Sequence, residues 1–130
     1  MVIDTSALVT VLRKETGFYS YAEAMANAGV RLVSAVTVME TTIVLEGRHG
    51  RGSGAELDLF IHHSPIEVSG FDLDQLEFAR DAFRRFGKGR HPAGLNFGDC
   101  FSYALAKISG EPLLYKGTDF GLTDVQGVLS

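Results

Sequence analysis

Two acidic residues of this chain follow apolar runs that have the length and composition of buried strands. Asp4 comes directly after Val2-Ile3, and Asp119 comes a few residues after the run 113–115. In open α/β sheets, ligands bind beyond the carboxyl ends of the strands. Both carboxylates are therefore candidates for a site at one end of a sheet. The alternatives are that Asp4 caps the following helix and that Asp119 is a turn residue.

Two further acids lie in segments that are expected to be helical. Glu40 has apolar residues one helical turn away on both sides, so it lies on or beside an apolar face, where an unpaired carboxylate is costly. Asp99 opens the expected helix 97–108 directly after Gly98, whose missing side chain lets another group approach the backbone. The alternatives are an arginine partner for Glu40 and a favourable position of Asp99 in the helix dipole.

A single shared site would explain all four acids. Carboxylates a few ångströms apart repel each other, so such a site needs protons or a cation. Oxygen ligands suit Mg²⁺ or Mn²⁺ rather than zinc. Mg²⁺ usually combines one or two carboxylates with phosphate oxygens of a substrate. The chemistry that these residues indicate is hydrolysis of a phosphodiester bond by a metal-activated water.

The elements that must position these acids alternate between strand and helix. We expect strands at 2–3, 31–34, 65–68 and 113–115, with 125 or 128–129 as candidates for a fifth, edge strand. Helical spacing is found from 6 to 13, from 18 to just before 29, and at 36–45, 55–62, 72–86 and 97–108. The glycine-rich stretches 47–54 and 87–96 are expected to be loops. This alternation predicts an α/β fold in a single domain, 1–130, with a central, mostly parallel sheet of four to five strands flanked by helices.

Composition limits the class of protein further. The chain has 130 residues, of which 45% are hydrophobic and 22% charged, which is typical of one folded domain rather than a disordered chain. A single cysteine, Cys100, excludes a disulfide framework and favours a reducing compartment. The sequence has no signal peptide and no apolar run near the ~18 residues that a membrane span needs. We therefore expect a cytoplasmic protein without a membrane partner.

The net charge of −4, from 12 basic and 16 acidic residues, argues by itself against a nucleic-acid partner. The basic residues are unevenly distributed, however, since five of the 12 lie between residues 80 and 90, just before the Asp99 segment. Four of them are candidates for contacts to RNA phosphates: Arg84, Arg85, Lys88 and Arg90. The alternative is a solvated helix face followed by a soluble loop.

Four segments that contain these acids follow one another along the chain: VIDTSAL at 2–8, SAVTVMETTIVLE at 34–46, GKGRHPAGLNFGDCFSYALA at 87–106 and EPLLYKGTDF at 111–120. Together they resemble PIN-domain ribonucleases, and most closely the VapC-type toxins of bacterial toxin–antitoxin pairs. The resemblance runs from residue 2 to about 125. It implies a parallel sheet flanked by helices, Mg²⁺-dependent cleavage of RNA, with Mn²⁺ as a substitute, a homodimer, and a cognate antitoxin that inhibits by blocking the site.

Residue by residue, the resemblance assigns four acids to the catalytic metal site: Asp4, Glu40, Asp99 and Asp119. The last of these matches the less constant fourth acid of the family, for which Asp124 is a second candidate of lower rank. Two hydroxyl residues match positions that the family often places near the metal: Ser6 and Thr118.

Two other functions stay open on the sequence alone. An aspartyl-phosphate phosphotransferase would use Asp4 as nucleophile and Lys116 to bind phosphate. The familiar form of that chemistry has a second acid two residues after the nucleophile, where this chain has Ser6. A non-catalytic binding module on the same fold is the other alternative, and the presence of all four acids argues against it.

Overall fold

Four short strands form a parallel sheet at the centre of the molecule. The computed structural model describes residues 1–129. In it, β1 (Val2–Ile3), β2 (Leu32–Ser34), β3 (Glu67–Ser69) and β4 (Leu113–Leu114) are arranged in the order β3-β2-β1-β4. Every pairing is parallel, and Val2 lies opposite both Leu32 and Leu113. All four strands therefore end at the same edge of the sheet, and Asp4 follows the central strand β1.

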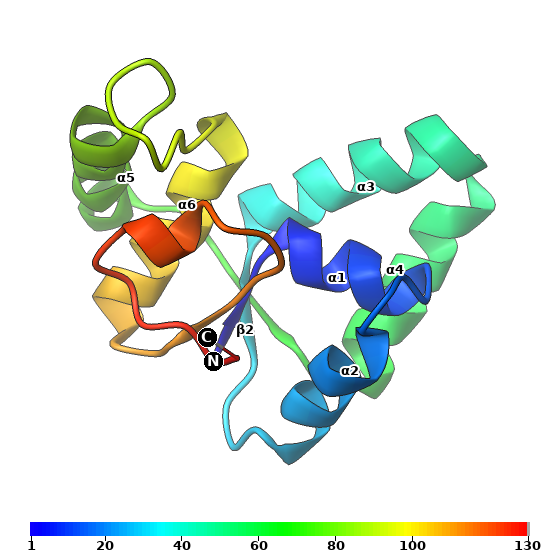
Figure 1. Ribbon diagram of the computed structural model, residues 1–130. Coiled ribbons are helices and arrows are strands. Elements are labelled where there is room, and N and C mark those ends of the chain that lie inside the picture. Colours follow the sequence, from blue (N-terminus) through cyan, green and yellow to red (C-terminus); the bar gives the residue numbers. More distant parts are fainter. Residues whose placement is uncertain (130) are drawn as a thin grey trace.

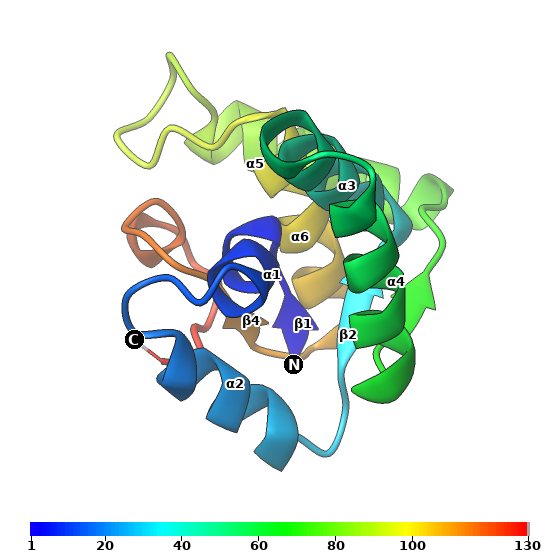
Figure 2. The ribbon, with the colours of Figure 1, turned by 90° about the vertical axis from the view of Figure 1, so that its right-hand side faces the viewer.

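Helices cover both faces of this sheet. Within residues 1–129 they are α1 (Thr5–Leu12), α2 (Phe18–Asn27), α3 (Ala35–His49), α4 (Gly52–His63), α5 (Leu73–Phe86) and α6 (Phe97–Ser109), followed by the short 3₁₀-helix η1 (Phe120–Leu122). Figure 1 shows α5 and α6 on one side of the strands and α1, α2 and α4 on the other, and Figure 2 gives the view from the α1–α4 side. None of these helices is long and apolar enough to cross a membrane.

The alternation of side chains along β1 separates two hydrophobic clusters. Val2 packs with residues of α5 and α6, whereas Ile3 packs with residues of α1, α2 and α4. Successive side chains of a strand point to opposite faces, so a two-residue strand suffices to anchor both layers. The predicted α/β fold with a parallel sheet flanked by helices is confirmed, with four strands.

The candidate fifth strand does not form. Residues 126–128 meet β4 at one isolated bridge, where Leu113 donates its backbone N–H to Gln126 and accepts one from Val128. The chain crosses the edge of β4 at this point instead of running along it, so no second pair of residues enters the ladder.

The stretch 47–54, predicted to be a loop, is largely helical. The helix α3 continues to His49 and α4 begins at Gly52, with Gly50 in the left-handed region at φ 85° between them. Gly54 permits close packing against α3, since a Cβ there would collide with the side chain of Glu46, whereas a Cβ on Gly47, Gly50 or Gly52 would meet open space. Glycine was therefore a misleading loop signal here.

The helix α3 buries a different face from the one that its apolar residues indicate. Met39 is 57% exposed and Ile43 is 60% exposed, whereas the buried side carries Thr37, Thr41 and Leu45. This helix turns its threonines toward α1 and α6, where hydroxyl groups are needed as hydrogen-bond donors.

Replacing the fully buried Leu57 of α4 with Ala should destabilise the protein by about 2–5 kcal/mol, because it leaves a cavity between α3 and α4. Leu59 of the same helix is 58% exposed, and its replacement with Ala should cost less than about 0.5 kcal/mol. Urea unfolding of both variants tests this difference. Equal losses would contradict the packing of α4 described here.

Candidate functional site

A cleft at the carboxyl edge of the sheet, here called the acidic cleft, brings together three of the four predicted acids. Asp4, Glu40 and Asp99 line it, and its volume is about 350 Å³. The three residues come from the end of β1, the middle of α3 and the first turn of α6. The parallel topology accounts for Asp4 and α3, which follow β1 and β2 at this edge, and α6 begins at the same edge because it leads back to the start of β4.

Asp4 is only 3% exposed, and both of its carboxylate oxygens accept hydrogen bonds. Oδ2 accepts from the backbone N–H of Ser6 at 3.1 Å and from its hydroxyl at 2.7 Å, so Asp4 caps α1. Oδ1 accepts from the hydroxyl of Ser102 at 2.6 Å. Asp4 therefore both caps α1 and lines the acidic cleft, and these hydrogen bonds hold its side chain in one orientation.

Glu40 is oriented by threonines rather than by an arginine. Its Oε1 accepts from the hydroxyl of Thr5 at 2.6 Å, and Thr41 donates to Thr5 at 3.1 Å. The carboxylate lies against Gly98, where a Cβ would collide with it, so this glycine permits the close approach that the sequence suggested. Burial raises the pKa of Glu40, the hydrogen bond from Thr5 opposes this, and the neighbouring Asp4 adds to the rise.

Asp99 forms a capping box with Asn96 at the start of α6. Its Oδ2 accepts from the backbone N–H of Asn96 at 3.0 Å, and its own N–H donates to the Asn96 side chain at 2.9 Å. Burial raises the pKa of Asp99 to about 7, against the lowering effect of the Asn96 N–H. The charges of Asp4, Glu40 and Asp119 also raise it. The other three predicted acids thus all act on the carboxyl group of Asp99.

The remaining predicted residues lie at different distances from this cleft. Asp119 is exposed, directly precedes η1 and acts on Asp99 through its charge, without lining the cleft. Thr118 is also exposed and outside the lining. Asp124 is occupied elsewhere, since it accepts hydrogen bonds from Tyr103 at 2.7 Å and Lys107 at 3.2 Å.

Ser6 links three parts of the acidic cleft. Its hydroxyl donates to Asp4 and accepts the backbone N–H of Lys116 at 3.0 Å, which ties the segment after β4 to α1. Lys116 in turn reaches Glu15, with 3.6 Å between Nζ and Oε1. Ser6 therefore fixes both an acid and a neighbouring cation of the cleft.

The hydroxyl donors Thr5, Thr41 and Ser102 were missed by reasoning from the sequence. Thr37 and Thr41 stand four residues apart on one side of α3, and this spacing was a usable signal of a polar helix face. Ser102 had no such signal, because its partner Asp4 is 98 residues away in the chain.

The four basic residues proposed to contact RNA do not line the acidic cleft, whose cationic lining residues are Arg48 and Lys116. Arg84 and Lys88 line a neighbouring cavity between α5 and α6. Arg85 pairs with Asp81 at 3.1 Å and with Asp124 at 3.4 Å. The guanidinium of Arg90 lies 4.7 Å from the ring centre of Phe83.

The donor set of the acidic cleft fits a hard divalent cation. Within residues 1–129, no group of three or more His, Cys, Asp or Glu side chains is placed so that it could hold a metal ion without some rearrangement. The hydrogen bonds to Glu40 and Asp99, however, use only one oxygen of each carboxylate, Oε1 and Oδ2. Partly free carboxylates that raise one another's pKa are suited to a cation that keeps several water ligands, as Mg²⁺ does.

The family model of the PIN domain matches residues 1–126, and the chain therefore belongs to the PIN domain family. Ribonuclease VapC of Mycolicibacterium smegmatis is 54% identical to it over 98% of this chain and 99% of its own length. Ribonuclease VapC30 of Mycobacterium tuberculosis is 50% identical over 98% of each chain. Within the PIN domain family, these relatives place the chain among the VapC ribonucleases.

Solved structures share the fold at low sequence identity. VapC20 of Mycobacterium tuberculosis, described as a sarcin-ricin loop cleaving toxin, aligns with a TM-score of 0.79 at 18% identity, over 98% of this chain and 97% of its own. A toxin–antitoxin complex from Klebsiella pneumoniae aligns with a TM-score of 0.69 at 17% identity, over 95% and 92%. These likenesses support the α/β architecture.

Replacing Asp99 with Asn should stabilise the metal-free protein above neutral pH. The unfolded carboxyl has a pKa of about 3.9, whereas burial raises the folded value to about 7. Ionisation therefore destabilises the folded state increasingly from pH ~4 to pH ~7. Asparagine removes this penalty and keeps an oxygen to accept the N–H of Asn96. We expect a gain of about 1–2 kcal/mol at pH 8, which allows for partial exposure of the side chain, and almost none at pH 4.

Urea unfolding at both pH values in a chelator measures this difference. A gain of the same size at pH 4 and pH 8 would show that the charge of Asp99 is not its cause.

Proposed function

We propose that this protein is an endoribonuclease that hydrolyses phosphodiester bonds of RNA with a water activated by Mg²⁺, for which Mn²⁺ can substitute. The observation that carries the proposal is the cleft at the carboxyl edge of the sheet, where Asp4, Glu40 and Asp99 gather although they come from three separate elements. Such like-charge crowding is costly without a function. The curated relatives, at 50–54% identity, are named ribonucleases.

In this proposal, Asp4, Glu40 and Asp99 hold the cation, and Asp119 adds negative charge from the rim of the site. The bound metal would polarise the phosphoryl oxygen and lower the pKa of its water. The chain itself orients the carboxylates, through hydroxyl donors at Asp4 and Glu40 and through the backbone N–H of Asn96 at Asp99. When no cation is bound, Asp99 holds a proton near neutral pH and so reduces the repulsion from its neighbours.

Cations of the acidic cleft would contact the phosphate backbone. Arg48 and Lys116 line the cleft beside the acids. A basic side chain at the scissile phosphate neutralises its charge and positions it against the acids. We assign Ser6 a supporting role through its contact with Asp4 and the N–H of Lys116. Thr118, which is exposed next to Asp119, is a weaker candidate for such a role.

The phosphotransferase alternative is disfavoured by the residue that stands two positions after Asp4. The familiar form of that chemistry has a second acid there, whereas this chain has Ser6, whose hydroxyl donates to Asp4. A non-catalytic binding module would not need three carboxylates in one cleft, so the acidic cleft disfavours that alternative.

We further propose that the protein acts in the cytoplasm, forms a homodimer and is inhibited by a cognate antitoxin that blocks the acidic cleft. The toxin–antitoxin complex from Klebsiella pneumoniae with the same fold supports an antitoxin partner. The single cysteine, Cys100, is buried and needs no oxidising compartment.

Replacing Asp4 or Asp99 with Ala should reduce metal-dependent RNA cleavage by at least about 10³-fold, because each removes a ligand of the cation. Asp58 is an exposed acid of α4, and its replacement with Ala should leave cleavage unchanged. A pool of end-labelled RNAs incubated with Mg²⁺ or with chelator measures the rates. Full activity of a purified Asp99→Ala variant would refute the proposed function.

Replacing Gly98 with Ala should displace the carboxylate of Glu40, because the new Cβ would collide with it. Alanine is a better helix former than glycine, so we expect the fold to persist. A displacement of about 1 Å in an active site can lower the rate by about 10²-fold. Cleavage assays combined with thermal unfolding test this. A variant as active as the native protein would exclude a catalytic role for the position of Glu40.

A further inference from the structure

The acidic cleft contains two basic side chains beside its acids, Arg48 and Lys116. An ammonium or guanidinium group next to half-buried carboxylates is attracted to them, and it would compete there with a divalent cation. Within residues 1–129, however, neither basic side chain forms an ion pair with Asp4, Glu40 or Asp99. The structure therefore separates the cations of the cleft from the acids that are suited to bind a metal.

The ammonium of Lys116 has a different partner, Glu15. The distance between Nζ and Oε1 is 3.6 Å, and both side chains are 39% exposed. Glu15 also lines the acidic cleft, where it is a fourth carboxylate that reasoning from the sequence did not identify. Among the carboxylates that line the cleft in residues 1–129, Glu15 is the one that pairs with a basic side chain.

The backbone after α1 brings Glu15 to the cleft through an unusual turn. Its N–H donates to the carbonyl of Thr10 at 2.9 Å, and the N–H of Lys14 donates to that of Val11 at 3.3 Å, which is the Schellman arrangement of a helix end. This motif needs a left-handed residue, usually glycine, whereas here Lys14 adopts that conformation at φ 51°. Strained backbone of this kind is typical of functional sites, so it indicates that the position of Glu15 matters.

Both partners of this ion pair are held close to Asp4. The hydroxyl of the fully buried Thr10, which donates to the carbonyl of Ser6 at 2.8 Å, also lies 3.3 Å from Oε1 of Glu15. The backbone N–H of Lys116 donates to the hydroxyl of Ser6 at 3.0 Å, and that hydroxyl donates to Asp4. The backbone of Lys116 is thus fixed beside the acids, and its flexible four-carbon side chain decides which carboxylate the ammonium contacts.

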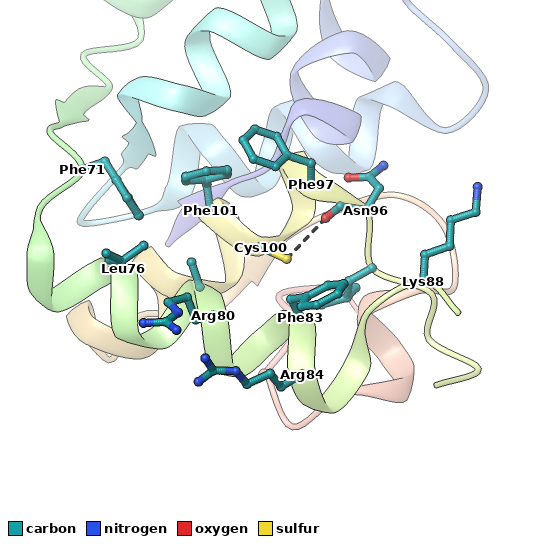
Figure 3. A pocket seen from close by; sticks show the side chains of 12 residues that line it. Phe71, Leu76, Arg80, Phe83, Arg84, Lys88, Asn96, Phe97, Cys100 and Phe101 are labelled. Carbon is teal, nitrogen blue, oxygen red and sulfur yellow. Dashed lines mark hydrogen bonds between the residues drawn. The ribbon is translucent and has the colours of Figure 1, made fainter. Parts of the chain in front are cut away.

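The other basic side chains near this end of the molecule are less able to reach the acids. Arg48 lies about two helical turns after Glu40 on α3, which corresponds to about 12 Å along the helix axis. Figure 3 shows Arg80, Arg84 and Lys88 around the cavity between α5 and α6, and none of them lines the acidic cleft. Lys116 is therefore the cation that would enter the metal site most readily.

We propose that Glu15 is a positioning residue that holds the ammonium of Lys116 at the edge of the acidic cleft, away from the carboxylates that bind the metal ion. The inference rests on the proposed function, because it supposes a divalent cation between Asp4, Glu40 and Asp99. Without the charge of Glu15, these acids would be the carboxylates left in the cleft for the ammonium, which would then compete with the metal ion. Held by Glu15, Lys116 leaves the acids free and stays available to a phosphate of the RNA.

Replacing Glu15 with Gln tests this role, because glutamine has nearly the same shape but no charge to hold the ammonium. Mn²⁺ serves as the probe, and electron paramagnetic resonance measures the free ion at about 0.15 M salt. We expect the affinity for Mn²⁺ to fall by about 2-fold to 5-fold, which corresponds to the strength of one exposed ion pair. Glu77→Gln on α5 is the matched control, since Glu77 pairs with Arg80 at 3.8 Å outside the acidic cleft, and it should leave this affinity unchanged.

The same change in a Lys116→Met background separates positioning from a direct effect of charge. If Glu15 acts by holding the ammonium, Glu15→Gln should lower the Mn²⁺ affinity much less when Lys116 is absent. An equal loss in both backgrounds would show that the charge of Glu15 acts on the metal ion directly, and it would overturn the proposal. An unchanged Mn²⁺ affinity in Glu15→Gln alone would overturn it as well.

Failure of the proposed function gives a different result. A native chain that binds Mn²⁺ no more tightly than its Asp99→Ala variant refutes the metal site, and with it both the proposed function and this inference. A native chain that binds Mn²⁺ through Asp99 and cleaves RNA, but whose Glu15→Gln variant has the same Mn²⁺ affinity, refutes the role of Glu15 alone.

Discussion

The burial of three carboxylates in one cleft is the constraint on which the rest of this structure depends. Asp4 and Asp99 each lie at the N-terminus of a helix, where unpaired backbone N–H groups and the helix dipole stabilise negative charge. Glu40, in the middle of α3, has no such terminus and depends on the hydroxyl of Thr5. Burial nevertheless raises the pKa of both Glu40 and Asp99, so these donors offset only part of the free-energy cost of removing the charged carboxylates from water.

The need for donors determines how α3 packs. Thr37 and Thr41 occupy its buried face and contact Ser102 and Thr5, the two residues that donate to Asp4 and Glu40. Buried hydroxyls contribute less to stability than well-packed aliphatic groups, and they require partners. Two apolar side chains of α3, Met39 and Ile43, consequently remain on the surface. Threonines that support the acidic cleft thus replace part of what would otherwise be a hydrophobic interface.

The distribution of charge matters more for this protein than its sum. Three of the acids converge on one cleft, where a divalent cation would offset them, while Arg84 and Lys88 line the neighbouring cavity between α5 and α6. The net charge of −4 is a sum over the whole chain and therefore does not indicate the charge of either region. Local fields of this kind steer and position charged ligands, whereas net charge mainly reflects solubility.

The sequence by itself determined the α/β alternation, the parallel sheet and the candidacy of Asp4, Glu40 and Asp99, because apolar runs followed by acids are local patterns. Only the tertiary structure decided that Ser102 holds Asp4 and that Gly98 accommodates Glu40, since these contacts join residues far apart in the chain. It also distinguished the two candidates for the fourth acid, since Asp119 acts on Asp99 through its charge, whereas Asp124 accepts hydrogen bonds from Tyr103 and Lys107. Helical spacing identified α3 but not its buried face, because the partners across an interface decide which face is buried.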